Sequence, residues 1–346
     1  MKKVTYEDFW QRVHADARKR SIPLRVMFEL TYECNFRCPH CYIPESFRKQ
    51  YRKSQLNTKQ VFRVLDELKA AGCLFLGFTG GEPFTRPDIL EILGYAKKQG
   101  FQVIIYTNGS LIDTKMIQEL TRINPNKVDI TIPGMTESVF ESITGVPGSR
   151  RAVFKVIELL DGQKIPLGFK SCLLQQNKKE IKAIREFARS MGCPHRLDTL
   201  LSPCLNGSTK PYKFRAETPQ AGIKDTRTEQ DRDSCVKQKD KPDNLFPCGA
   251  GNSQAAITPA GELKLCVMIE DPKYNILKTT FVQAWLNIRE DAMAIRPDKN
   301  YLCSGCDLRT YCSWCPARAW LYDKSFTSCD PQARKWAQKD KENYVS

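Results

Sequence analysis

The chain has 346 residues, 15 cysteines and a formal net charge of +15. Its length exceeds the usual size of one domain, no segment approaches the roughly 20 apolar residues of a membrane helix, and the first residues lack the apolar stretch of a signal peptide. These features exclude a secreted disulfide framework and predict a cytoplasmic protein without a membrane partner, whose reduced cysteines bind metal or clusters.

The first predicted elements are a strand and a helix. Residues 25–30 form an apolar run typical of a strand, and three cysteines follow it in a loop. Asn57 is the expected N-cap of a helix, since Gln60 stands three residues later, and Gly72 is the expected end. One face of this helix carries Val61, Val64, Leu65 and Leu68.

Strands and helices then alternate as far as residue 201. The further predicted strands are 74–78, 103–106, 128–132, 167–174 and 196–201, and the further helices are 88–99, 115–123, 152–160 and 180–191. Six strands separated by five helices predict an α/β fold with a parallel sheet, either open or curved into a barrel. Ligands of such sheets bind at the carboxyl ends of the strands.

The remainder of the chain has a different composition. Residues 202–247 are polar and charged, which predicts a linker or bridging region. Residues 248–346 are rich in cysteine and contain a hairpin-like segment at 255–266 with a turn at 259–262. We therefore expect an N-terminal extension (1–22), an α/β core (23–201), the bridge (202–247) and a small irregular cysteine-rich domain (248–346).

Cys34, Cys38 and Cys41 form a C-x3-C-x2-C pattern without a fourth cysteine nearby. A structural zinc site takes four ligands, and His40 is a strained fourth ligand because it is adjacent to Cys41. A four-iron cluster held by three cysteines instead keeps one iron without a protein ligand. Such an iron can bind a substrate or a cofactor.

With Tyr42 after its third cysteine, the pattern resembles the signature of the radical SAM superfamily. The resemblance implies a partial (β/α)6 barrel and a [4Fe-4S] cluster that binds S-adenosylmethionine and yields a hydrogen-abstracting 5′-deoxyadenosyl radical. Gly80, Gly81, Glu82 and Pro83 look like the family's GGE motif, which lies near the methionyl amine. Glycines permit close backbone approach and a carboxylate accepts hydrogen bonds from an ammonium. By the same resemblance, Thr107 and Asn108 line the cofactor pocket.

Seven cysteines follow in the last hundred residues: Cys248, Cys266, Cys303, Cys306, Cys312, Cys315 and Cys329. Paired C-x2-C units suit zinc, so two zinc sites are one interpretation. The spacing also resembles the SPASM extension of radical SAM enzymes, with two rather than three residues between Cys312 and Cys315. That resemblance implies two auxiliary [4Fe-4S] clusters, one on Cys303, Cys306, Cys312 and Cys329 and the other on Cys248, Cys266 and Cys315.

The second auxiliary cluster lacks an obvious fourth ligand. Asn252, Ser253 and Gln254 fill the position where some relatives have a cysteine, so this cluster is either open or recruits Cys235. Lone cysteines are usually small buried apolar residues, which we expect of Cys73, Cys172, Cys193 and Cys204. Lys170 and Asp198 face either the barrel interior or the surface.

The resemblance implies an oxidoreductase that matures a ribosomally synthesised precursor peptide, through a thioether or carbon–carbon crosslink or by epimerisation. The expected partners are that peptide and an electron donor such as flavodoxin or ferredoxin, with a separate leader-binding protein as a further candidate. The sequence does not identify the catalytic residue.

Other functions stay open. Sulfatase maturases carry an acidic residue where this chain has Val267, whereas porphyrin-modifying relatives share the architecture. The positive charge favours anionic partners, but no nucleic-acid module is recognisable, so nucleic acid is not expected. The basic run 48–53 is interpreted as solvated surface. Outside the enzymes, a zinc-bound scaffold is the alternative.

Overall fold

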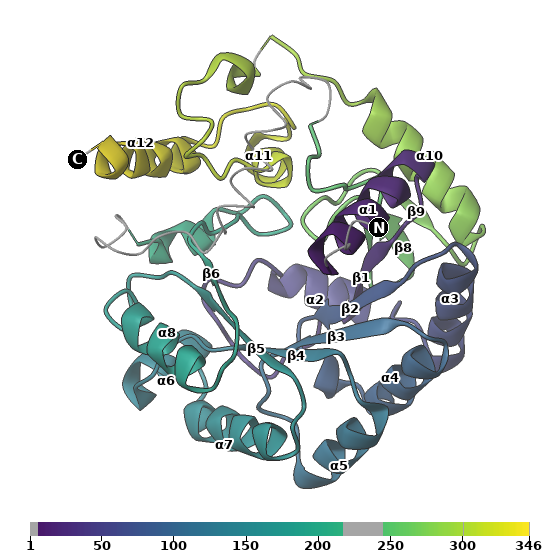
Figure 1. The fold of residues 1–346 in the computed structure, drawn as a ribbon, viewed down its shortest axis with the longest axis vertical. Helices are drawn as coiled ribbons and strands as arrows, with labels where there is room; N and C mark the ends of the chain where they lie inside the picture. Colours follow the sequence, from purple (N-terminus) through teal and green to yellow (C-terminus); the bar gives the residue numbers. More distant parts are fainter. Residues whose placement is uncertain (1–5, 217–244, 300, 346) are drawn as a thin grey trace, which may run out of the picture.

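The computed structural model describes residues 6–216, 245–299 and 301–345. A nine-stranded sheet in the order β6-β5-β4-β3-β2-β1-β7-β8-β9 crosses the middle of the molecule (Figure 1). The six predicted strands are present and pair in parallel, which confirms the α/β expectation. They are β1 (Arg25–Thr31), β2 (Phe75–Gly80), β3 (Gln102–Thr107), β4 (Lys127–Thr131), β5 (Leu167–Cys172) and β6 (His195–Asp198).

The five predicted helices are also present. They are α3 (Thr58–Ala70), α4 (Ile89–Lys98), α5 (Thr114–Ile123), α7 (Ser149–Gly162) and α8 (Ile181–Ser190), and they follow the outside of the curved sheet (Figure 1). Asn57 caps α3 as predicted, because its side chain accepts from the backbone of Gln60 at 3.0 Å while the Gln60 side chain accepts from the backbone of Asn57 at 3.0 Å. The apolar face of α3 is buried.

Several short or charged elements were not predicted. They are α1 (Tyr6–Arg20), α2 (Glu45–Arg52), α6 (Glu137–Thr144), α10 (Phe281–Ala294), α11 (Pro316–Asp323), α12 (Pro331–Val345) and the 3-10 turns η1 (Pro83–Thr85), η2 (Lys210–Phe214) and η4 (Leu302–Gly305). Most of residues 48–53 lie in α2, where Lys49, Gln50, Arg52 and Lys53 are exposed, whereas Tyr51 is buried and Arg48 is partly buried. Charge alone does not reveal a helix whose contacts are tertiary.

Side chains on β5 and β6 divide between the two faces of the sheet. Phe169 stacks on Phe187 of α8 with ring centroids 5.5 Å apart, so its neighbours Lys170 and Cys172 face the concave side. Lys170 Nζ lies 5.9 Å from the ring centroid of Tyr106, and Cys172 pairs in register with Asp198. Lys170 and Asp198, which the sequence placed either in the barrel interior or at the surface, therefore face the concave side of the sheet.

The sheet continues into the cysteine-rich region. β7 (Gln254–Ile257) pairs in parallel with β1, and β8 (Glu262–Lys264) and β9 (Lys273–Asn275) follow in antiparallel order. The predicted hairpin is confirmed, with Gly261 in its turn at a φ of 74°. Across the parts of the chain that the structure describes, every helix is too short or too polar to cross a membrane.

The cap of α3 generates a stability prediction. We expect Asn57→Ala to lower the free energy of unfolding by about 1 kcal/mol, because it leaves the backbone N–H of Gln60 without its acceptor. Asn57→Asp keeps a side-chain oxygen and serves as the control. Urea unfolding of both variants is the measurement, and equal stability of the two would contradict the cap's contribution.

Candidate active site and cysteine clusters

The first three cysteines lie in the loop that follows β1. Their chain is anchored by the backbone N–H of Arg37, which donates to the carbonyl of Thr144 at 2.8 Å, and by a turn in which Cys41 donates to the carbonyl of Cys38 at 3.1 Å. All three cysteines are partly buried. The loop therefore presents them at the carboxyl end of the parallel strands, where such folds bind ligands.

Hydrogen-bond donors surround these sulfurs. Arg48 on α2 donates from Nη2 to Cys41 Sγ at 3.6 Å, and Asn108 donates from Nδ2 to Cys34 Sγ at 3.9 Å. The backbone N–H of Phe36 donates to Cys34 Sγ at 3.4 Å. Donors of this kind favour the thiolate form that metal binding requires. The sequence had not pointed to Arg48, because it lies in a basic run with no distinguishing pattern.

Burial disfavours the charged form of two of these thiols. Burial raises the pKa of Cys34 to about 11, and burial followed by the charges of Cys41 and Cys34 raises the pKa of Cys38 further. The mutual effect indicates that the sulfurs lie close together. A cluster bound here would therefore displace the protons of the Cys34 and Cys38 thiols.

Gly80, the last residue of β2, and Gly81 allow their backbone to approach the backbone at Thr31 and Glu33. A Cβ on Gly80 would lie 2.0 Å from the carbonyl oxygen of Thr31, and one on Gly81 would lie 2.3 Å from that of Glu33. Gly81 and Glu82 donate backbone hydrogen bonds to these two carbonyls at 2.7 and 2.8 Å. The pair of glycines thus locks this turn against the cysteine loop.

Glu82 is fully buried and holds the end of β3. Its carboxylate accepts from Thr107 Oγ1 at 2.7 Å, from the backbone N–H of Asn108 at 2.6 Å and from that of Phe84 at 3.0 Å. Burial raises its pKa to about 7, against the lowering effect of these hydrogen bonds. Because Asn108 reaches Cys34, Glu82 also positions a donor to the first cysteine.

Tyr42 and Pro83 complete the predicted cofactor-binding set. Pro83 is buried at the start of η1, and Tyr42 donates its hydroxyl to Glu29 Oε1 at 3.4 Å. The structure therefore gathers Tyr42, Gly80, Gly81, Glu82, Pro83, Thr107 and Asn108 around the first cysteine loop.

The remaining cysteines form two further sets. Burial raises the pKa of Cys303 to about 12, and the charges of Cys312, Cys329 and Cys306 add to the effect. Burial likewise raises the pKa of Cys266 to about 12, with contributions from Cys315 and Cys248. Cys303, Cys306, Cys312 and Cys329 are thus within electrostatic reach of one another, as are, separately, Cys248, Cys266 and Cys315.

The residues beside Cys248 have other partners. Gln254 Nε2 donates to the carbonyl of Cys248 at 2.6 Å, Asn252 Oδ1 accepts from Ser21 Oγ at 3.3 Å, and Ser253 is buried. Cys235, the other candidate for a fourth ligand, lies outside the described residues. Cys248 itself is exposed.

Two cysteines interpreted as structural lie beside the first set. Cys204 donates from Sγ to the carbonyl of Cys41 at 3.6 Å, and the charge of Cys172 contributes to the raised pKa of Cys38. Neither cysteine belongs to a metal-binding sequence motif. The only sequence signal was the alternation of side chains along β5, which puts Cys172 on the concave face. Cys73 is buried at the start of β2 as expected.

The residues around the first loop fit a bound group. His40 Nδ1 and Arg48 Nε are buried without a hydrogen-bond partner, which is uncommon unless another group satisfies them. Within the described ranges, no three His, Cys, Asp or Glu side chains converge as a single metal ion would require. Three thiols in one loop are the ligand type that iron–sulfur clusters use, so the donor chemistry of Cys34, Cys38 and Cys41 suits a cluster.

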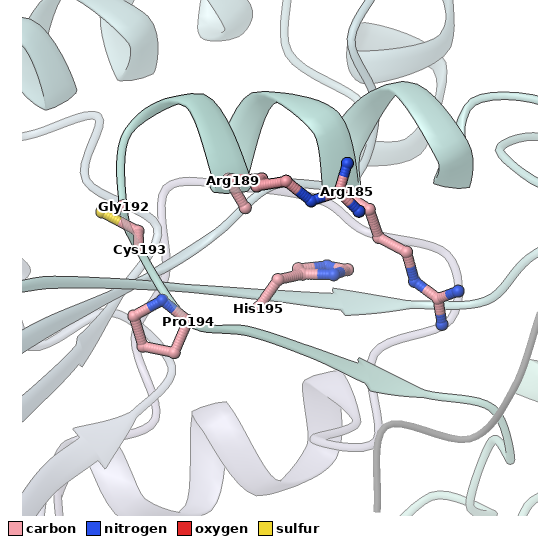
Figure 2. Close-up of a pocket in the computed structure, with 7 residues that line it drawn as sticks. Arg185, Arg189, Gly192, Cys193, Pro194 and His195 are labelled. Atoms are coloured by element: carbon pink, nitrogen blue, oxygen red, sulfur yellow. The ribbon is translucent and has the colours of Figure 1, made fainter.

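A hollow of about 530 Å³ lies away from these residues, between α8 and the start of β6 (Figure 2). Arg185 and Arg189 extend from the helix and His195 from the strand beneath it. Because His195 begins β6, the hollow is at the amino end of the strand. The first cysteine loop follows the opposite, carboxyl end of β1, so the hollow is separate from that loop.

Comparison with known families and curated proteins gives sequence matches. Residues 28–188 match the model of the Radical SAM superfamily. The AdoMet-dependent heme synthase of Methanosarcina barkeri is 22% identical, covering 89% of this chain and 95% of that protein. The subtilosin biosynthesis protein AlbA of Bacillus subtilis is 26% identical over 85% of this chain and 67% of its own length. The PqqA peptide cyclase of Granulibacter bethesdensis is 27% identical, over 49% of this chain and only 45% of its own length.

Solved structures share the fold. Streptococcus suis SuiB bound to precursor peptide SuiA has a TM-score of 0.67 at 17% identity, covering 95% of this chain and 80% of that one. Native anSMEcpe with bound AdoMet and Cp18Cys peptide has a TM-score of 0.64 at 14% identity, covering 94% and 100%. At these identities the likeness concerns the fold.

The raised pKa of Glu82 predicts a pH dependence. The Glu82 carboxyl has a pKa of about 7 in the folded chain and 4.5 in the unfolded chain. Between these pH values the folded chain therefore binds more protons than the unfolded chain. The stabilisation is therefore complete below pH 4.5 and is lost as the pH rises through 7, a loss of about 3 kcal/mol at roughly 1.4 kcal/mol per pKa unit.

We expect Glu82→Gln to remove this decline in the free energy of unfolding between pH 5 and 8, because an amide does not titrate. Glu91→Gln removes an exposed carboxylate from α4 and is the control that keeps the decline. Urea unfolding at several pH values is the measurement. An unchanged slope in Glu82→Gln would show that this carboxyl does not titrate in the range.

Proposed function

Residues 28–188 form a domain of the radical SAM superfamily, and on this premise we propose that the chain matures a ribosomally synthesised precursor peptide. The observation that carries the proposal is the match to AlbA. That alignment covers 85% of this chain and extends well beyond the radical SAM domain, so it includes part of the cysteine-rich region. The peptide-bound SuiB and anSMEcpe structures share the fold and are consistent with a peptide substrate.

Cys34, Cys38 and Cys41 would hold the first [4Fe-4S] cluster. When bound, that cluster and S-adenosylmethionine supply a 5′-deoxyadenosyl radical, which abstracts a hydrogen atom from the substrate. Arg48 and Asn108 donate to the thiolates and stabilise their charge. Glu82 keeps Asn108 in place from its buried position.

The two further sets would hold the auxiliary [4Fe-4S] clusters. Cys303, Cys306, Cys312 and Cys329 provide four thiolates, which close a cluster. Cys248, Cys266 and Cys315 provide three, and the exposure of Cys248 makes this cluster the one a substrate thiolate can approach. Such an approach favours thioether formation over a carbon–carbon crosslink or epimerisation.

The positive charge of the chain supports two partners. A net charge of +15 attracts an acidic leader peptide and an acidic electron donor such as flavodoxin or ferredoxin. A separate leader-binding protein is a further proposed partner.

The second candidate function is porphyrin modification. The match to the AdoMet-dependent heme synthase favours it, because that alignment covers 95% of the relative. Two substrates separate the candidates: short peptides encoded beside the gene, and an iron porphyrin. Anaerobic incubation with reductant and S-adenosylmethionine, followed by mass spectrometry, is the experiment. A change of mass or configuration in a peptide supports the proposal, whereas conversion of the porphyrin alone supports the second candidate.

The cluster assignment makes its own prediction. We expect the triple variant Cys34→Ala, Cys38→Ala and Cys41→Ala to lose about four irons per chain and all formation of 5′-deoxyadenosine. Iron analysis and chromatography of the reduced, reconstituted protein are the measurements. Cys73→Ala changes a buried cysteine outside the three sets and should retain both properties. Full iron content in the triple variant would exclude the first loop as a cluster site.

A further inference from the structure

A fully buried lysine lies between two of the cysteine sets. Lys264 ends β8, and its Nζ is 3.1 Å from Glu29 Oε2, 2.7 Å from Glu270 Oε1 and 3.0 Å from the carbonyl oxygen of Val267. The side chains of Lys264 and Glu29 are both 0% exposed, and that of Glu270 is 13% exposed. Charges buried to this degree are costly unless they are paired, so the arrangement requires an explanation beyond stability.

The network formed by Lys264, Glu29 and Glu270 extends to the first cysteine loop and to the set of Cys248, Cys266 and Cys315. Glu29 accepts from the hydroxyl of Tyr42, which directly follows Cys41. Lys264 stands two residues before Cys266 and binds the carbonyl of the residue after it. The raised pKa of Tyr42, caused first by burial and then by Glu29, also includes contributions from Cys41 and Cys266. The phenol is therefore within electrostatic reach of both sets.

The network carries more negative than positive charge. The neighbours of the Glu29 carboxylate are the hydroxyls of Tyr32 and Tyr42 and the ammonium of Lys264, all of which donate to it. Burial raises the pKa of Glu29, whereas the charge of Lys264 and the hydrogen bonds from Lys264 and Tyr32 oppose that rise. With Glu29 ionised beside the ammonium of Lys264, Glu29 and Glu270 together outweigh the one charge of Lys264. A buried negative excess disfavours the addition of an electron to a nearby redox centre, because Coulomb energies are poorly screened there.

We propose that the Glu29–Lys264–Glu270 network sets the reduction potential of the cluster held by Cys248, Cys266 and Cys315. The inference rests on the proposed function, since it requires a cluster at that set. Lys264 holds the loop after Cys266, and Glu270 adds the negative charge that lowers the potential. All three are positioning residues, because they act on the cluster without touching substrate.

Glu270→Gln tests the proposal. It removes one negative charge and leaves Lys264 paired with Glu29, so the midpoint potential of this cluster should shift upward. The variant is made in the Cys34→Ala, Cys38→Ala, Cys41→Ala background, which leaves only the two auxiliary clusters to titrate. Potentiometric titration followed by electron paramagnetic resonance should show one of the two potentials raised and the other unchanged.

Glu262→Gln is the matched control. Glu262 and Glu270 are each four residues from Cys266, but Glu262 pairs with Lys273 at 3.2 Å, is 21% exposed and does not contact Lys264. Its removal should leave both potentials unchanged, since its ion-pair partner is Lys273 on β9 rather than Lys264. Unchanged potentials in an iron-loaded Glu270→Gln variant would overturn the proposal, as would equal shifts in the two variants.

Glu29→Gln provides a second variant if Glu270→Gln does not retain its iron. It removes the other carboxylate from Lys264 without altering the loop after Cys266, and the same potential should again rise. An unchanged potential there overturns the proposal. Failure of the proposed function is distinguishable, because a chain that binds no iron gives no cluster signal in any variant.

Discussion

The parallel pairing of β1 with β2 brings the first cysteine loop and the glycine turn together at one edge of the sheet. β1 delivers Cys34, Cys38 and Cys41 to its carboxyl edge, and β2 delivers Gly80, Gly81 and Glu82 beside them, because parallel neighbours end at the same edge. β7 also runs parallel to β1, but the chain reverses at Gly261 and β8 runs antiparallel, so Cys266 follows a strand of the opposite direction.

Two buried acidic residues hold neighbouring strands together by different means. Glu82 accepts hydrogen bonds that join β2 to the end of β3 and place Asn108 against Cys34. Glu29 forms an ion pair with Lys264, which joins β1 to β8. In both cases the buried carboxylate connects strands rather than facing solvent, so each contributes through the geometry that it imposes.

Much of the architecture was predictable because its signals are local. The period of apolar residues in 57–72 and the cap at Asn57 depend only on neighbours in sequence, and the structure confirms both. The functions of Arg48, Cys172 and Lys264 were not predictable in this way. None of the three stands in a distinctive local sequence pattern. The role of each comes from its tertiary surroundings rather than from its neighbours in sequence.

The sequence by itself determined the parallel α/β fold and the first cysteine pattern, because strand periodicity and ligand spacing are properties of short segments. Only the tertiary structure decided that the sheet extends through β7 into the cysteine-rich region, that Lys170 faces the concave side, and that a buried lysine lies between two cysteine sets. These depend on which strands pair, and pairing is a choice among distant segments that no local pattern specifies.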